Sequence, residues 1–454
     1  MARSRWFLAV FTIALFTATA ARSQGPAPAP PMGWSEWDSY GLTITEADFR
    51  ANATVLAGFR QYGWQYALLD AGWYEKNPSG RDAAQRNYVL DINGRLLPAP
   101  NRFPSAANVA GFKPLADWLH ARGLKLGIHV MLGIPRQAVE GNRPIANSQF
   151  RASEAADTTQ TCSWDKEFFV VKDNAAGQAW YDSIARQYAA WGVDFIKLGC
   201  VADHPFHASE IHQIHEAIRR TGRPMVLSLS PGPLPQDYMN SAAHDAQMVR
   251  VSPEHWDLWL TPPGKDFPVG LRNDFDLLAQ WASWPQPGSS IDPDALPDGW
   301  LAPRPPVGQS RYTQLTPDEQ RSQFALWVFA RAPLIEGANL TRLDPLTRNL
   351  MTNRGLIAID QRARASHPLA NLPSGFEHLR VWEADSGSPE HTRRAFAFFN
   401  VDNRPAALNI KWSELALPLG KHAARDLWTG EPQRPSADLY LHLPPHGSSV
   451  VQAQ

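Results

Sequence analysis

The sequence predicts a (β/α)8 TIM barrel followed by a C-terminal antiparallel β-sandwich. Two observations lead to this prediction. Short apolar runs alternate with amphipathic stretches from residue 32 to about residue 335, and from about Ser366 the helical patterns stop. The chain has 454 residues, which is too long for one ordinary domain, and 44% of them are apolar, which suffices for a large core and a smaller one.

The first part of the chain alternates strand and helix patterns. The candidate strands are residues 32–34, 66–70, 124–130, 193–197, 225–229, 248–251, a poorly defined segment before Asp292, and 332–335. The helical patterns between them cover residues 46–62, 112–122, 176–191, 210–220, 271–284 and 316–331. Thr316 supplies an N-cap and Pro317 suits the first helical position. Such alternation is typical of parallel strands, and about eight of them favour a barrel over the alternative, a doubly wound sheet.

The last part of the chain consists of short, partly alternating apolar runs between turn residues. These runs cover residues 394–400, 407–412, 424–428 and 439–443. Their pattern is typical of an antiparallel β-sandwich. We therefore expect the barrel over residues 24–365 and, over residues 366–454, a sandwich that carries no chemistry.

The N-terminus has the pattern of an export signal, expected over residues 1–23. Basic Arg3 and Arg5 precede an apolar stretch and then small residues that suit cleavage. The stretch is short for a retained membrane helix, which needs about 20 apolar residues. We expect a secreted or periplasmic protein. In such an oxidising compartment the only two cysteines, Cys162 and Cys200, can form a disulfide, and the alternative is two buried free thiols.

Composition limits the partners. A formal net charge of −1 gives no reason to expect a nucleic acid or an anionic membrane as partner. No Gly-rich phosphate-binding loop follows a strand, so no nucleotide cofactor is expected. His204, His207, His212 and His215 lie close together, but no cysteine or carboxylate completes a site of known spacing, so no metal is expected. The sequence does not predict the oligomeric state.

The reactive residues of a barrel lie where its strands end. The polar and aromatic residues at or after the predicted strand ends are Glu36, Trp37, Asp38, Asp70, Trp73, His129, Lys197, Arg250, Glu254 and Asp257. Cations donate hydrogen bonds to hydroxyls, carboxylates accept them, and indole faces stack on sugar rings. The set therefore suits a neutral, polyhydroxylated ligand.

Several ordered motifs carry a resemblance to a known family. They lie at residues 30–37 (PPMGWSEW), 69–73 (LDAGW), 191–197 (WGVDFIK), 250–257 (RVSPEHWD), 315–320 (LTPDEQ), 332–334 (APL) and 353–361 (NRGLIAIDQ), with further counterparts at 425–428 and 444–447. From Pro31 to the C-terminus the chain resembles glycoside hydrolase family 27, the α-galactosidases. The resemblance implies an oligosaccharide or glycoside substrate.

The resemblance also implies site residues. Trp37 and Trp73 would line the sugar pocket, Asp70 and Lys197 would bind ring hydroxyls, and Arg250 would bind near C2. Glu254 falls where the family places its general acid/base, usually an Asp. Cys200 occupies a family cysteine position with Cys162 as a plausible partner, which favours the disulfide.

One departure concerns the nucleophile. Retaining glycosidases need two carboxyl groups about 5–5.5 Å apart. The family's nucleophile is the Asp two residues after the strand-end lysine, and here that residue is Gly199. An inverting route would pair Glu254 with another base and a water, and the candidate bases are Asp203, Asp257 and Asp292. Ala71, which is a second Asp in many members, and residues 230–232 indicate a reshaped pocket.

Two functions remain open. The chain is either an exported hydrolase of the α-galactosidase type with altered machinery, or a sugar-binding pseudoenzyme that has kept the binding residues. We favour the hydrolase.

Overall fold

The computed structural model describes residues 27–453 except 109, 203–204, 285–287, 303–307, 370–375 and 389–390. The predicted signal segment and the candidate base Asp203 lie outside the described residues. Among the described residues, no helix is both long and apolar enough to cross a lipid bilayer.

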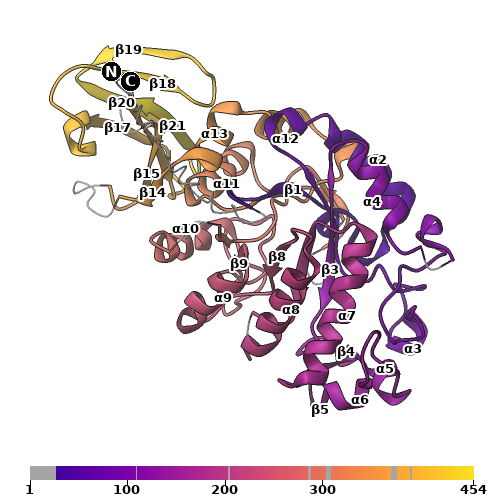
Figure 1. The fold of residues 1–454 in the computed structure, drawn as a ribbon. Coiled ribbons are helices and arrows are strands. Elements are labelled where there is room, and N and C mark those ends of the chain that lie inside the picture. Colours follow the sequence, from indigo (N-terminus) through magenta and orange to yellow (C-terminus); the bar gives the residue numbers. More distant parts are fainter. Residues whose placement is uncertain are drawn as a thin grey trace, which may run out of the picture.

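Eight parallel strands form one curled sheet, which confirms the predicted barrel class (Figure 1). The strands are β1 (Met32–Ser35), β2 (Tyr66–Leu69), β3 (Lys125–Met131), β7 (Phe195–Gly199), β8 (Val226–Leu229), β9 (Met248–Arg250), β10 (Ser290–Asp292) and β13 (Leu334–Glu336). Their order is β10-β9-β8-β7-β3-β2-β1-β13. Leu296, just after β10, makes a parallel bridge to Glu336 of β13, which links the two end strands.

Helices alternate with these strands along the chain. They are α2 (Glu46–Ala57), α4 (Lys113–His120), α7 (Ala175–Trp191), α8 (Ala208–Thr221), α9 (Met239–Asp245), α10 (Leu271–Trp281), α11 (Pro317–Ala330), α12 (Pro345–Met351) and α13 (Arg354–Arg362). Thr316 caps α11, and its side chain accepts a hydrogen bond from the Glu319 N–H, as its position in the sequence predicts. Short elements on the connections are α1 (Trp37–Tyr40), α3 (Ala83–Arg86), β11 (Trp300–Leu301) and β12 (Arg311–Tyr312).

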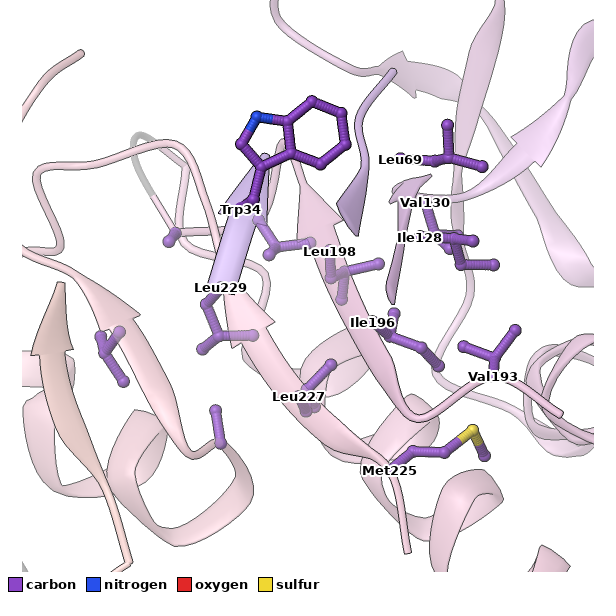
Figure 2. Close-up of a cluster of buried hydrophobic side chains, with 14 of the residues drawn as sticks. Trp34, Leu69, Ile128, Val130, Val193, Ile196, Leu198, Met225, Leu227 and Leu229 are labelled. Carbon is purple, nitrogen blue, oxygen red and sulfur yellow. The ribbon is translucent and has the colours of Figure 1, made fainter. Parts of the chain in front are cut away.

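The alternation of side chains along β7 places Lys197 and Gly199 in the barrel interior. Successive side chains of a strand point to opposite faces. Ile196 and Leu198 pack in the large core that includes the helices (Figure 2). Phe195 packs instead with a small apolar cluster from neighbouring strands inside the barrel. Lys197 and Gly199 share the face of Phe195, so they lie inside the barrel at the carboxyl end of the strand.

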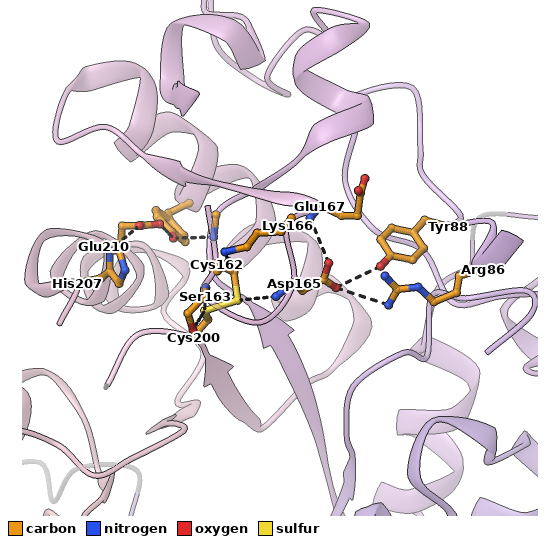
Figure 3. Close-up of a disulfide and its surroundings, with 12 residues drawn as sticks. Arg86, Tyr88, Cys162, Ser163, Asp165, Lys166, Glu167, Cys200, His207 and Glu210 are labelled. Atoms are coloured by element: carbon orange, nitrogen blue, oxygen red, sulfur yellow. Dashed lines mark hydrogen bonds and ion pairs between the residues drawn. A yellow bond between two sulfur atoms is a disulfide. The ribbon is translucent and has the colours of Figure 1, made fainter. Parts of the chain in front are cut away.

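A small antiparallel sheet, which the sequence did not predict, is inserted between β3 and α7. It contains β4 (Ile134–Pro135), β6 (Phe168–Val171) and β5 (Ala156–Thr161), with α5 (Arg136–Glu140) and α6 (Ala152–Ala155) beside it in the sequence. The loop between β5 and β6 carries Cys162, which forms a disulfide with Cys200 (Figure 3). The predicted disulfide is therefore confirmed. It connects the insertion to the residue that follows β7.

The C-terminal part is an antiparallel β-sandwich. One sheet contains β14 (Ala365–Pro368), β15 (Leu379–Ser388), β16 (His391–Asn400), β21 (Ser448–Ala453), β18 (His422–Asp426) and β19 (Pro432–Ser436), and the other contains β17 (Ala406–Lys411) and β20 (Asp438–Leu443). His446 fixes the sandwich to the barrel because its ring stacks on Trp259 at 3.8 Å and its Nδ1 lies 2.6 Å from Glu319 Oε1.

We predict that the disulfide contributes substantially to stability. It closes a loop with a sequence separation of 38 residues. Replacing both cysteines (Cys162→Ser with Cys200→Ser) should lower the free energy of unfolding by about 2–4 kcal/mol, because the open chain gains conformational freedom when unfolded. Urea unfolding with and without a reductant measures this. The reductant should lower the stability of the parent protein and leave that of the variant unchanged. Equal stability of the parent and the variant without reductant would contradict the prediction.

Candidate functional site

A pocket of about 640 Å³ opens at the carboxyl ends of the barrel strands. The residues that line it are Trp37, Asp70, Ala71, His129, Trp164, Lys197, Ser230, Pro231, Gly232, Pro233, Arg250, Pro253, Glu254, Asp266 and Phe267. They come from the ends of β2, β3, β7 and β9 and from the loops that follow the strands. Beneath the pocket, a cavity of about 30 Å³ lies inside the barrel and shares Trp37, Lys197 and Arg250 with it.

Asp70 and Lys197 form a partly buried ion pair on the pocket wall. Lys197 Nζ donates to Asp70 Oδ2 at 2.7 Å, and the Ala71 N–H donates to Asp70 Oδ1 at 2.8 Å. Burial alone would raise the pKa of Asp70, but the Lys197 ammonium and His129 lower this pKa to about 2. Asp70 is therefore ionised at neutral pH, and each of its oxygens already accepts a hydrogen bond.

The Glu36 side chain holds the backbone of Asp70. Its Oε1 accepts a hydrogen bond from the Asp70 backbone N–H at 2.6 Å. Burial and the Asp70 charge raise the pKa of Glu36 well above its ordinary value. Both effects favour the protonated form of Glu36, which would place no second negative charge next to Asp70.

Arg250, at the end of β9, is almost fully buried and is held by two carboxylates. Its Nε donates to Asp292 at 3.2 Å and one of its terminal nitrogens donates to Asp294 at 2.6 Å. These two carboxylates outweigh the effect of burial and raise the pKa of the guanidinium further. Arg250 is thus a fixed, permanently charged donor in the pocket wall.

Glu254 is the carboxyl group of the pocket that favours its protonated form. Trp37 Nε1 donates to its Oε1 at 3.0 Å, and Trp256 Nε1 donates to its Oε2 at 3.4 Å. Burial, together with the nearby charge of Asp294, raises the pKa of Glu254. A carboxyl group with a raised pKa in a pocket can donate a proton to a bound ligand.

Gly199 lies against His129. In the sheet, His129 of β3 pairs with Lys197 of β7, two residues before Gly199. A Cβ atom added to Gly199 would lie 2.4 Å from His129 Nε2 and 3.5 Å from Trp164 Cζ2. Real Cβ atoms do not approach another atom to 2.4 Å, so the imidazole occupies the space that a side chain at position 199 would need.

His129 itself is buried and neutral. Its side chain reaches the pocket wall with the residue only 4% exposed. Burial, aided by the Lys197 ammonium and opposed by Asp70, lowers the pKa of His129 to about 4. Its Nδ1 is buried without a hydrogen-bond partner among the described residues.

The structure brings five of the sequence-predicted binding and acid residues together in this pocket. They are Trp37, Asp70, Lys197, Arg250 and Glu254. Trp73 does not lie among the residues that line this pocket. It is buried against Phe112 and Trp191, and its Nε1 donates a hydrogen bond to the His129 carbonyl at 2.8 Å. It fixes the backbone of His129 and does not line the pocket.

The candidate bases do not gather around Gly199. Asp257 is fully buried, pairs with Arg311 at 2.6 Å and accepts from the Gln314 N–H at 2.8 Å. Asp292 pairs with Arg250 and lines the small cavity beneath the pocket. Asp203 lies outside the described residues.

Several pocket residues carry no signal in the sequence that predicts their place. Trp164 lies in the inserted loop, 51% exposed, and Asp266 and Phe267 lie in the long connection after β9. None of them follows a barrel strand directly, so the strand-end rule could not find them. His129 was among the polar strand-end residues, but nothing in the sequence indicated its proximity to Gly199.

Comparisons with known proteins match nearly the whole chain. The family described as "Alpha galactosidase A" matches residues 29–142 and 174–362, and "Alpha galactosidase C-terminal beta sandwich domain" matches residues 378–453. The unmatched residues 143–173 contain the loop with Cys162 and Trp164.

Solved structures and relatives agree with these matches. A GH27 β-L-arabinopyranosidase from Geobacillus stearothermophilus is 35% identical with a TM-score of 0.87, over 94% of this chain and 97% of that one. A further structure of that arabinopyranosidase is a complex with arabinose. The α-galactosidase of Cyamopsis tetragonoloba is 27% identical over 88% of this chain and 79% of its own length. The α-N-acetylgalactosaminidase of Gallus gallus is 29% identical over 90% of this chain and 88% of its own length.

We predict that Gly199→Ala destabilises the protein through His129. The added methyl group forces the buried imidazole to move, which should cost about 1–3 kcal/mol of unfolding free energy. In a His129→Ala background the same substitution should be nearly neutral, because the opposing ring is gone. Chemical denaturation of the four proteins measures the coupling. Gly355→Ala, in α13, is the matched control, since a Cβ atom at this position would have its nearest neighbours at 3.4 Å. An equal loss of stability from Gly199→Ala with and without the His129 ring would contradict the steric explanation.

Proposed function

Because the chain belongs to glycoside hydrolase family 27, we propose that it is an exported hydrolase that cleaves terminal α-galactosides or closely related pyranosides. The observation that carries this proposal is Glu254, a carboxyl group with a raised pKa in a sugar-sized pocket. Two fixed cations and an ionised carboxylate face the same pocket. The charged groups suit a neutral ligand rich in hydroxyls. The Glu254 carboxyl group suits a glycosidic oxygen that must be protonated before it can leave.

Each side chain then has a task. Glu254 is the general acid, and the Trp37 indole orients it. Lys197 donates to ring hydroxyls while Asp70 accepts from them, and Arg250 donates near C2. Trp73 acts through packing and through its hydrogen bond to the His129 carbonyl, in contrast to the expectation that it lines the pocket.

The sugar is a galactoside or its analogue without the C6 hydroxymethyl group. β-L-Arabinopyranose has the ring configuration of α-D-galactopyranose and lacks C6. Ala71, on the pocket wall, offers only a methyl group where many family members have a second Asp. The similarity to the arabinopyranosidase supports the smaller sugar as a substrate of this chain.

A second candidate function is sugar binding without turnover. The observation that favours it is Gly199, which leaves no carboxylate at the nucleophile position. The same hydroxyl-binding residues would serve recognition in that case.

Export rests on the sequence pattern of residues 1–23. The Cys162–Cys200 disulfide supports it, because disulfides persist in oxidising compartments.

We predict that the purified chain hydrolyses aryl α-galactosides or aryl β-L-arabinopyranosides and that Glu254→Gln lowers kcat/KM by about 10²–10⁴. The loss arises because the amide cannot protonate the leaving oxygen. Glu140→Gln, at an exposed position at the end of α5, is the matched control and should keep full activity. A chain that binds these sugars but hydrolyses neither glycoside would support the binding protein instead.

The pH dependence should identify Glu254 as the acid. Because the pKa of Glu254 is raised, its carboxyl group stays protonated at pH values where an ordinary glutamic acid is ionised. On the alkaline side, kcat/KM should therefore stay high until the pH rises through this raised pKa, and should then fall. A dinitrophenyl glycoside needs no protonation to leave, so Glu254→Gln should still cleave it, without this alkaline decline. Persistence of the same decline in Glu254→Gln would assign it to another group.

A further inference from the structure

The His129 imidazole lies next to the position of the missing nucleophile. A retaining carboxylate at position 199 would have to share its space with the His129 imidazole, whose Nε2 lies 2.4 Å from the site of the absent Cβ. The backbone of Gly199 does not demand glycine, because its φ lies outside the left-handed region. The constraint comes instead from the imidazole, which would have to shift to admit a side chain at position 199.

We propose that His129 is the general base of this enzyme and activates a water molecule for direct attack on the anomeric carbon. This inference rests on the proposed hydrolase function and deepens it. His129 then takes over, by a different chemistry, the place that the nucleophilic carboxylate holds in a retaining enzyme.

The reaction balances without any further reactant. Water forms a bond to the anomeric carbon through its oxygen as the bond from that carbon to the glycosidic oxygen breaks. His129 Nε2 takes the water proton, and Glu254 gives its proton to the departing oxygen. Transfer of one proton from the imidazolium to the Glu254 carboxylate, through solvent, restores both groups.

The reaction requires one tautomer of His129, and no described residue hydrogen-bonds to Nδ1 to fix either tautomer. For Nε2 to accept a proton, Nδ1 must carry the hydrogen of the neutral ring. Lowering of the His129 pKa to about 4 keeps the ring neutral at physiological pH and makes it about as basic as a carboxylate. The Asp70 carboxylate, which raises the pKa of His129, stabilises the imidazolium once it forms, and Lys197 opposes it.

No described carboxylate of the pocket is better placed to serve as base. Asp70, whose pKa is lowered to about 2, is a weaker base than His129. Glu254 is needed as the acid. Asp266 lines the pocket but is solvent-exposed, in the connection after β9 rather than beside β7. It is therefore the alternative that the experiment must test.

A general base in this position predicts inversion of configuration. Inverting enzymes separate the acid from the base by enough room for a water molecule on the face opposite the leaving group. No covalent intermediate forms, so the first product carries the opposite anomeric configuration from the substrate.

The test combines product stereochemistry with three variants. Proton NMR of the fresh hydrolysate of an aryl α-galactoside, and of an aryl β-L-arabinopyranoside, records the first anomer released by the unaltered enzyme. His129→Asn and Asp266→Asn are compared in kcat and in affinity for the free sugar. His244→Asn, at an exposed position of α9, is the matched control for a histidine outside the pocket.

We expect inversion by the unaltered enzyme and a loss of about 10²-fold or more in kcat for His129→Asn with sugar affinity largely kept. Asp266→Asn should lose far less in kcat than His129→Asn, and His244→Asn should keep a normal rate. Retention, a normal kcat for His129→Asn, or a loss confined to Asp266→Asn would overturn the inference while leaving the hydrolase function intact. An unaltered enzyme that binds both sugars and cleaves neither glycoside would overturn both. The stereochemical result needs no variant, so it decides even if His129→Asn folds poorly.

Discussion

The contact between Gly199 and His129 is the constraint on which the rest of the site depends. Because position 199 lacks a side chain, the imidazole can lie against the end of β7 and the Trp164 indole can approach the same position. The next residue, Cys200, has a φ of 69°, which a non-glycine residue seldom adopts, and its sulfur is bonded to Cys162 of the inserted loop. The insertion that carries Trp164 is thus covalently fixed beside the same strand end.

The electrostatics of the pocket divide its groups into charged and neutral ones. Asp70 keeps its charge because Lys197 compensates for its burial, and Arg250 keeps its charge between Asp292 and Asp294. Glu254 and Glu36 have raised pKa values because burial and neighbouring carboxylates disfavour their ionised forms. Separation of this kind gives a site both fixed charges for binding hydroxyls and a proton to donate.

The sequence predicted the barrel well because periodicity and chain order carry that information. The runs that ended in Asp70, Lys197 and Arg250 became parallel strands of one curled sheet, so their polar ends met in one pocket, and Thr316 capped its helix as expected. The sequence could not predict the role of Trp73, because a strand-end indole has the same pattern whether it faces a ligand or packs on Phe112. It also missed the inserted sheet, whose strands are short and partly polar, and the approach of His129 to Gly199, which depends on strand register and side-chain direction.

The most direct test of the role of His129 is a crystal structure of Glu254→Gln with an uncleaved aryl glycoside in the pocket. If His129 is the base, the structure should show an ordered water within hydrogen-bonding distance of His129 Nε2 and in line with the anomeric carbon, on the face opposite the leaving oxygen. A carboxylate in contact with that carbon, with His129 turned away from it, would contradict the account.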